Sequence, residues 1–302
     1  MGRIREALRH HLIYLAGAIA IAGSIDPARA EAAPQNASVT EPATCKALLT
    51  CRGGSSSSEQ ADTDDRLDPD RPHLPEAATA VGVGRAMLES GYTFTSNAGA
   101  FRSDSLPEAL LRVGVIADWL ELRVGQNFSR ERRVEMGNAS TSAGFQDLYL
   151  GAKFALTEQR GLIPAIAVIP QGTLPTGSSS QTAHRILAGV NADFAWNVVK
   201  DVFGIELVVA NNQVKDELGG IQHQLATGIT GVFQLSKQLE LFAEWDAVYL
   251  RGGLASTTTQ HYAVGGLVYF LTRDLALDAR AGVGLNNSSN RFLTGVSLAV
   301  RF

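Results

Sequence analysis

The sequence predicts an all-β protein, a transmembrane up-and-down antiparallel β-barrel of about twelve strands. Three observations lead to this prediction. Apolar and polar residues alternate over segments of about ten residues throughout positions 81–302. The connections between these segments are alternately short and long, and aromatic residues gather near both ends of the segments.

Residues 1–30 have the composition of a cleavable secretory signal peptide. A basic region, an uncharged apolar run and a small-x-small cleavage site follow one another at Arg3, Arg5 and Arg9, at 12–22, and at Ala28-Arg29-Ala30. The run is too short for a membrane-spanning helix, which needs roughly 20 apolar residues. We therefore expect an exported protein whose mature chain begins at Glu31.

Residues 31–78 are predicted to be a disordered periplasmic tether. They are rich in Ala, Pro, Ser and Asp, and they contain too few apolar side chains to pack a core. The aspartates between 62 and 70 lack the Gly and the distal Glu of a calcium loop, so no metal or other cofactor is expected. Cys45 and Cys51 are candidates for a disulfide in an oxidising periplasm, with an unbonded pair as the alternative.

Residues 79–302 are assigned to the barrel itself. In the segment from Trp119 onward, Leu120 and Leu122 lie on one face while Glu121 and Arg123 lie on the other, as expected for a strand between lipid and a polar lumen. The other segments repeat this pattern. The predicted strand cores begin at Val83, Leu110, Trp119, Phe145, Leu162, Arg185, Val202, Gln222, Leu239, His261, Leu275 and Arg291.

The connections predict which ends of the strands face the periplasm. Tight turns are expected at 118, 158–161, 199–201, 236–238 and 272–274. Longer polar loops are expected at 96–106, 130–144, 174–184, 212–221 and 252–260. Short periplasmic turns and longer external loops are typical of outer-membrane barrels, so both termini should be periplasmic.

Aromatic residues support the same orientation, because rings on the outer face of a barrel gather at the two membrane interfaces. The turn side is expected to carry Phe154, Trp196, Phe203, Phe233, Phe270 and Phe302, and the loop side Tyr92, Phe94, Phe128, Tyr249, Tyr262 and Phe292. A soluble barrel or sandwich is the competing fold. Such a fold usually has a Lys-rich surface, whereas this chain has only five lysines.

The inward parity of the strands places fifteen charged residues in the predicted lumen. They are Arg85, Glu89, Arg112, Glu121, Arg123, Asp147, Lys153, Asp193, Glu206, Glu240, Glu244, Asp246, Asp278, Arg280 and Arg301. They either pair into a rigid network or line a solute path. The surplus is acidic and centred on Glu240, Glu244 and Asp246, which predicts a small conductance with a mild preference for cations.

Other function classes find less support in the sequence. The net charge of -4 and the lack of a basic cluster with interleaved aromatics argue against a nucleic-acid partner. An outer-membrane lipid hydrolase is the enzymatic alternative, and it would use His184, His223 or His261 with one of the serines at 178–180. No G-x-S-x-G pattern accompanies these residues, so no catalytic residue is assigned and the chain is not expected to be an enzyme. A structural or adhesive barrel is the third alternative.

The C-terminal residues 292–302 resemble the assembly signal of outer-membrane barrels, with alternating apolar residues and a terminal Phe302. Elsewhere the chain resembles the outer-membrane transporter family named after the meta-cleavage pathway of phenol degradation. The residues that carry this likeness are Asp70-Arg71-Pro72, Glu89-Ser90-Gly91-Tyr92, those at 110–114, 120–123 and 144–153, and Leu174-Pro175-Thr176-Gly177.

The two resemblances imply a location, partners and a function. The expected partners are outer-membrane lipid, the barrel-assembly machinery acting on the C-terminal strand, and a small solute. The expected location is the bacterial outer membrane. The expected function is a channel for small, aromatic or hydrophobic, solutes.

Overall fold

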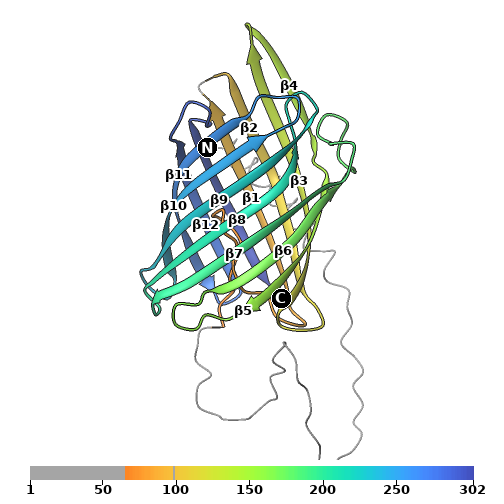
Figure 1. The fold of residues 1–302 in the computed structure, drawn as a ribbon. Coiled ribbons are helices and arrows are strands. Elements are labelled where there is room, and N and C mark those ends of the chain that lie inside the picture. Colours follow the sequence, from red (N-terminus) through yellow and green to blue (C-terminus); the bar gives the residue numbers. More distant parts are fainter. Residues whose placement is uncertain (1–64, 98) are drawn as a thin grey trace, which may run out of the picture. The chain divides into compact units, whose positions relative to one another are not determined.

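A computed structural model describes residues 65–97 and 99–302, which form a closed antiparallel β-barrel (Figure 1). This confirms the predicted fold class. The described strands are β1 (Ala86–Asn97), β2 (Phe101–Gly114), β3 (Leu120–Glu135), β4 (Asn138–Phe145), β5 (Leu148–Thr157), β6 (Ala165–Leu174), β7 (Leu187–Val199), β8 (Phe203–Lys215), β9 (Ile221–Gln234), β10 (Leu239–Arg251), β11 (Thr258–Thr272), β12 (Leu275–Gly284) and β13 (Phe292–Arg301).

The barrel closes with twelve wall positions rather than thirteen. Consecutive strands pair with one another except β4 and β5, which both pair with β3, and β1 also pairs with β13. Residues 120–125 of β3 pair with β5, and residues 128–135 pair with β4. β4 and β5 therefore occupy one strand position in the wall, which is interrupted at Gln146 and Asp147. The predicted number of about twelve strands is therefore correct.

Two of the predicted external loops are strands instead. The loop expected at 96–106 is a hairpin in which Asn97 pairs with Phe101. The loop expected at 130–144 is the hairpin of β3 and β4, which rises beyond the barrel rim (Figure 1). Both stretches are polar, so the apolar alternation that identifies a membrane strand is missing although the backbone pairing continues.

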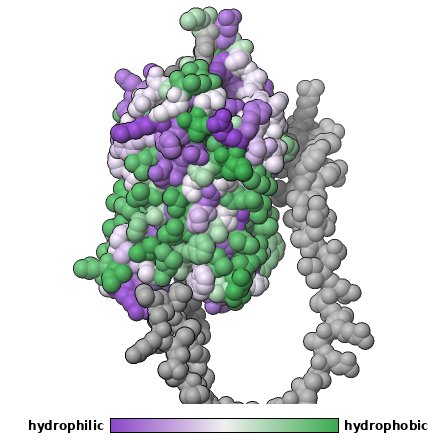
Figure 2. All heavy atoms as spheres, turned by 45° about the vertical axis from the view of Figure 1, so that its right-hand side comes forward, coloured by the Kyte–Doolittle hydropathy of each residue, from purple (hydrophilic) through white to green (hydrophobic). Residues whose placement is uncertain are grey.

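The outer face of the barrel is apolar. Half-exposed Leu122, Val124, Leu225, Trp245 and Val296 belong to four different strands. On the face drawn in Figure 2, hydrophobic residues form a broad band and hydrophilic residues gather above it. The described residues include no helix with the length and hydropathy of a membrane span.

Two aromatic side chains predicted for the outer face point inward. Phe270 belongs to a buried apolar cluster, and Tyr262 pairs directly with the buried Asp246. The exposed large residues on this part of β11 are Leu267, Tyr269 and Leu271. The parity of β11 is therefore opposite to the predicted one, because its apolar residues occur at both parities and the alternation there is ambiguous.

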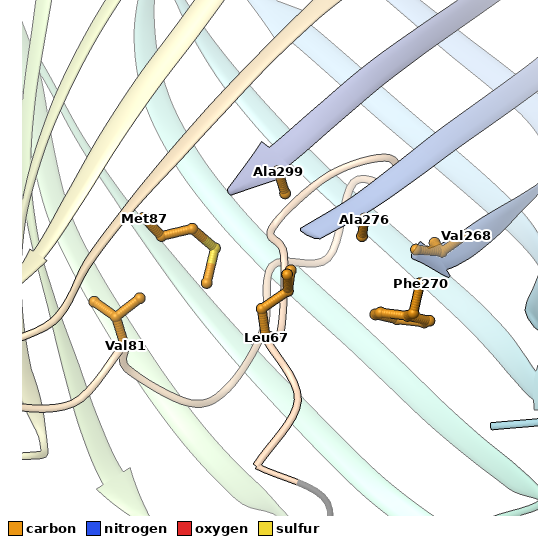
Figure 3. Packing of buried hydrophobic residues seen from close by; sticks show 7 residues of the cluster. All are labelled: Leu67, Val81, Met87, Val268, Phe270, Ala276 and Ala299. Atoms are coloured by element: carbon orange, nitrogen blue, oxygen red, sulfur yellow. The ribbon is translucent and has the colours of Figure 1, made fainter. Parts of the chain in front are cut away.

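Residues 65–81, which we name the lumen segment, lie inside the barrel without helical or strand structure. Their polar contacts reach β1, β2, β3, β5, β7, β8, β10 and β12, which is feasible only from the interior. Leu67 and Val81 pack with Met87, Val268 and Phe270 at the turn-side end (Figure 3). Leu74 packs against a second cluster of Val208, Ala210 and Ala226.

The lumen segment corrects the predicted end of the disordered tether. Residues 65–78 were assigned to that tether, yet Leu67 and Asp70 are almost fully buried within the barrel. The physical reason is that the barrel wall supplies the hydrogen bonds and apolar contacts that this sequence cannot supply for itself. The predicted signal peptide, residues 31–64 and both cysteines lie outside the described residues.

Candidate functional site

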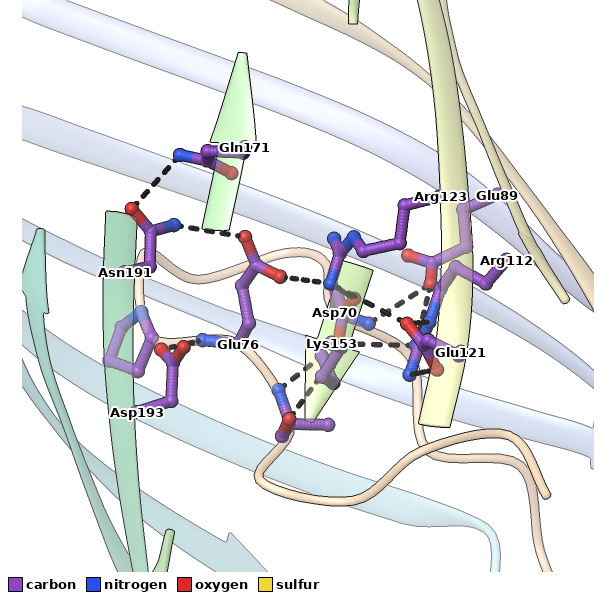
Figure 4. A network of polar contacts seen from close by, with 12 residues as sticks. Asp70, Glu76, Glu89, Arg112, Glu121, Arg123, Lys153, Gln171, Asn191 and Asp193 are labelled. Carbon is purple, nitrogen blue, oxygen red and sulfur yellow. Dashed lines mark hydrogen bonds and ion pairs between the residues drawn. The ribbon is translucent and has the colours of Figure 1, made fainter. Parts of the chain in front are cut away.

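The centre of the lumen is a charged network built around Asp70 of the lumen segment (Figure 4). One carboxylate oxygen of Asp70 lies 2.6 Å from the Lys153 ammonium, and the other lies 2.8 Å from the Arg123 guanidinium. Arg112 is 3.2 Å away. Burial raises the pKa of Asp70, but the positive charges of Arg112, Lys153 and Arg123 outweigh this and hold its pKa well below the usual range.

Two wall carboxylates complete the pairing of Arg112. Its guanidinium lies 3.0 Å from Glu89 on β1 and 2.8 Å from Glu121 on β3. All three side chains are buried to about 99 % or more. Because unpaired charges at such burial are strongly unfavourable, the wall and the lumen segment depend on each other for neutralisation.

Wall carboxylates also hold the backbone of the lumen segment. Glu89 accepts hydrogen bonds from the backbone N–H groups of Asp70 and Arg71, at 3.1 and 3.2 Å. Further N–H groups bind in the same way, with Leu74 donating to Glu244, Glu76 to Asp193 and Val81 to Glu121. An irregular segment has no partners of its own for these N–H groups, so acids on four strands of the wall fix its path.

The tip of the lumen segment lies among further charges. His73 lies 3.4 Å from Glu206, and its Nδ1 is 2.7 Å from the carbonyl oxygen of Pro75. Arg280 donates a hydrogen bond to the carbonyl oxygen of Pro72. Burial lowers the pKa of His73, but the negative charges of Glu206 and Glu244 more than compensate and raise it to about 9. A protonated His73 therefore adds a cation to this acidic part of the wall.

An uncharged wall continues from the charged network. The Tyr149 hydroxyl donates to Gln171 at 2.8 Å, and Gln171 donates to Asn191 and Asn212 at 3.0 and 2.8 Å. Asn191 donates in turn to Glu76 of the lumen segment at 3.3 Å. These amides and this hydroxyl, from β5 to β8, offer both donors and acceptors to a neutral polar solute.

The structure places the predicted lumen charges in three groups. Those that contact residues 66–81 are Glu89, Arg112, Glu121, Arg123, Lys153, Asp193, Glu206, Glu240, Glu244 and Arg280. Asp246 is buried, and so is Asp278, which accepts a hydrogen bond from Ser297. Arg85, Arg301 and Asp147 lie towards the ends of the barrel.

The residues at the ends differ from the predicted lining role. Arg85 and Arg301 both pair with Asp65 where the lumen segment begins, and the side chain of Arg85 is 44 % exposed. Asp147 interrupts the β4–β5 position and accepts hydrogen bonds from Gly177 and Ala183 of the loop between β6 and β7. Asp147 therefore fixes an external loop.

The acidic surplus is also distributed differently from the prediction. Glu240 lies 3.6 Å from Arg66, and Glu244 accepts hydrogen bonds from Leu74 and Thr230. Arg66 was missed because it precedes the region of alternating residues. Two of the three carboxylates thus hold the lumen segment instead of standing free in a path. Of these three, Asp246 is the one with a buried oxygen that has no hydrogen-bond partner among the described residues.

Sequence reasoning missed the role of the lumen segment's own charged residues, which are Asp65, Arg66, Asp68, Asp70, Arg71, His73 and Glu76. One signal was present, since the family likeness begins at Asp70-Arg71-Pro72. The histidines considered for a hydrolase lie elsewhere. His261 stacks on Trp245 on the outer face, and within the described chain no ring nitrogen of His184, His223 or His261 hydrogen-bonds a serine.

Comparison with known proteins assigns the family. The sequence matches the family described as "Putative MetA-pathway of phenol degradation" over residues 69–302. The chain belongs to this family. The match to the phenol-degradation family includes Asp70 and most of the lumen segment, whereas residues 1–68 lie outside it. No curated protein matches the sequence.

Solved structures agree with the fold of this phenol-degradation family member. An outer membrane channel from Pseudomonas putida F1 is similar, with a TM-score of 0.63 and 14 % identity over 76 % of this chain and 100 % of that chain. The KdgM porin in complex with disordered oligogalacturonate has a TM-score of 0.46 and 12 % identity over 72 % of this chain and 99 % of that chain. At 14 % identity, the likeness to the Pseudomonas putida F1 channel concerns the fold alone.

Proposed function

We propose that the protein is an outer-membrane channel for small uncharged solutes, aromatic ones among them, whose lumen is narrowed by its own N-terminal segment. The observation that carries this proposal is the contrast between an apolar outer face and a polar interior occupied by residues 65–81. A twelve-strand barrel has a lumen wider than the filled eight-strand case and narrower than a general porin. The lumen segment reduces this width further.

The proposed location is the outer membrane, with both termini periplasmic. Supporting observations are the apolar outer band, the signal-peptide pattern of residues 1–30 and the shared end of the described termini. Asp65 pairs with Arg301, and Phe302 exchanges backbone hydrogen bonds with Ala86. The hydrogen bonds between Phe302 and Ala86 close the barrel between β13 and β1. This place at the closing seam supports the proposal that the assembly machinery recognises Phe302.

The proposed preference for uncharged solutes rests on the uncharged wall of Tyr149, Gln171, Asn191 and Asn212. Neutral donors and acceptors can exchange their mutual hydrogen bonds for those of a hydroxylated solute without exposing a bare charge. The charged groups beside them are already paired with one another, so an incoming ion finds little net attraction.

Swelling of liposomes that contain the purified barrel tests this proposal. Small neutral solutes with hydroxyl groups should enter faster than anions of equal size. The variant Gln171→Leu removes the central amide of the uncharged wall and should slow the neutral solutes, while Gln159→Leu, in a tight turn, serves as the control. Equal entry of anions and neutral solutes would contradict the proposed preference.

A further inference from the structure

A cationic patch lies on the outside of the barrel at the loop-side end of β2 and β3. Arg102 lies directly across from Arg132, and Asp104 lies directly across from Arg130. Residues directly opposite each other in an antiparallel pair point to the same face of the sheet. These four side chains line a cavity of about 210 Å³, and we name them the arginine patch.

The neighbours of the arginine patch show that it faces outward. Asp104 lies across from Phe94, whose ring is 6.5 Å from the exposed ring of Phe292. Arg102 lies over the same Phe94 ring at 5.0 Å. On the opposite face of these strands, Thr93 and Glu108 bind Arg71 of the lumen segment. The inner face is thereby identified, and the patch is on the other one.

The level of the patch follows from the outer face of β3. Leu122 and Val124 are half-exposed apolar residues. Gln126, whose amide donates to the carbonyl oxygen of Gln146, and Phe128, which packs on Phe145 at 5.3 Å, come next, and Arg130 and Arg132 follow. Ten residues from the start of β3 to Arg130 cover about 33 Å, which is about 25 Å of height at a tilt of about 40°. This is about the height of the apolar band of an outer-membrane barrel.

The arginine patch therefore lies just beyond the hydrocarbon, where lipid headgroups are found. Figure 2 agrees, because hydrophilic residues gather directly above the hydrophobic band. Arg130 and Arg132 are exposed, and no carboxylate of the described residues comes within salt-bridge distance of either. Three guanidinium groups against one carboxylate leave an excess of positive charge in a chain whose net charge is -4.

We propose that the arginine patch binds the phosphate groups of a phosphorylated lipid of the outer leaflet. Guanidinium groups match phosphate oxygens with paired hydrogen bonds, and a headgroup held there keeps its acyl chains against the apolar face below. Basic pockets beside the hydrocarbon are a recurring form of headgroup recognition. The inference rests on the membrane placement proposed above and not on what the lumen conducts.

Binding of lipid A to the purified, folded full chain in detergent tests the proposal by native mass spectrometry. The two ligand arms are bisphosphorylated lipid A and the same lipid without phosphates, and inorganic phosphate serves as a competitor. The unmodified chain should prefer the phosphorylated lipid. The double variant Arg130→Gln/Arg132→Gln should bind it at least about tenfold more weakly, because it loses two charge-assisted hydrogen-bonding groups.

Arg251→Gln is the matched control, since Arg251 is an exposed lone arginine at the same end of β10, and its binding should not change. If the double variant does not fold, the single variant Arg102→Gln tests the same cavity. The proposal would be overturned if the patch variants kept their affinity or if the dephosphorylated lipid bound equally well. It would also be overturned if inorganic phosphate displaced the lipid at a concentration no higher than that of the lipid. A barrel that binds lipid A but admits no solute would refute only the channel.

Discussion

At the scale of single residues, the molecule depends on a few buried charges that neutralise each other across two parts of the chain. Alternation in the strands was sufficient to find Arg112, Arg123 and Lys153, because a charge at an inward position interrupts the apolar pattern. It could not find Asp70, their shared partner, because the lumen segment has no period. The sequence pattern therefore identifies the buried charged residues of the wall but not the residue that neutralises them.

Replacing Asp70 should disrupt this network. Asp70→Asn leaves the charges of Arg112, Arg123 and Lys153 without their common carboxylate, and removal of one partner from a buried ion pair costs about 3–5 kcal/mol. We expect a lower temperature for heat-induced loss of the folded form on gels. Asp68→Asn is the control, because Asp68 is exposed and accepts one hydrogen bond from Thr79. An equal decrease in both variants would argue against a special role of Asp70.

The raised pKa of His73 predicts a pH dependence. Its pKa in the folded protein is about 9, above the ordinary value of 6.5, so its stabilisation is complete below about pH 6.5 and is lost as the pH rises through about 9. The corresponding free energy is at most about 3 kcal/mol. The lumen segment should therefore loosen between pH 8 and 10, visible as increased current fluctuations in planar bilayers. His73→Gln should remove this pH dependence. Identical pH profiles of the current fluctuations in the unmodified chain and in His73→Gln would refute the role of His73.

At the scale of elements, the lumen segment, the end of the β1–β2 hairpin and the β3–β4 hairpin are the parts that sequence patterns did not predict. The membrane strands were predictable because lipid outside and polar groups inside impose a period of two. The lumen segment meets wall atoms on all sides, and its N–H groups bind carboxylates of several strands, so no period results. The loop-side ends of both hairpins extend beyond the apolar band, so their residues need no apolar outer face.

Glu244 provides a test of how the wall fixes this element. Glu244→Ala removes the acceptor for Leu74 N–H and for the Thr230 hydroxyl, at 2.9 and 2.7 Å in the structure. We expect a looser lumen segment and a larger mean single-channel conductance. Glu244→Gln keeps an acceptor oxygen and should change conductance less. If both variants instead showed only a reduced cation preference, Glu244 would be lining an open path as the sequence alone suggested.

At the scale of the whole molecule, an apolar band, a polar interior and a closed set of strands form a barrel whose lumen is occupied by its own chain. The fold class, the strand number and nearly all strand positions were predictable from alternation and connection lengths. The occupied lumen was not, because it depends on many weak contacts between parts distant in sequence, such as Leu74 with Glu244 and Arg71 with Glu108.

Single-channel conductance in planar bilayers tests the central claim most directly. The full chain should give a small conductance, and a variant without residues 65–80 a larger one, because the lumen segment narrows the barrel. Gly91→Leu is a second route if the deletion does not fold, since a Cβ at Gly91 would lie 2.8 Å from the Cβ of Ser297 on β13 and 3.0 Å from the Arg71 guanidinium, so the added side chain would compete with Arg71 for its place. Equal conductance of the full chain and both variants would contradict the claim.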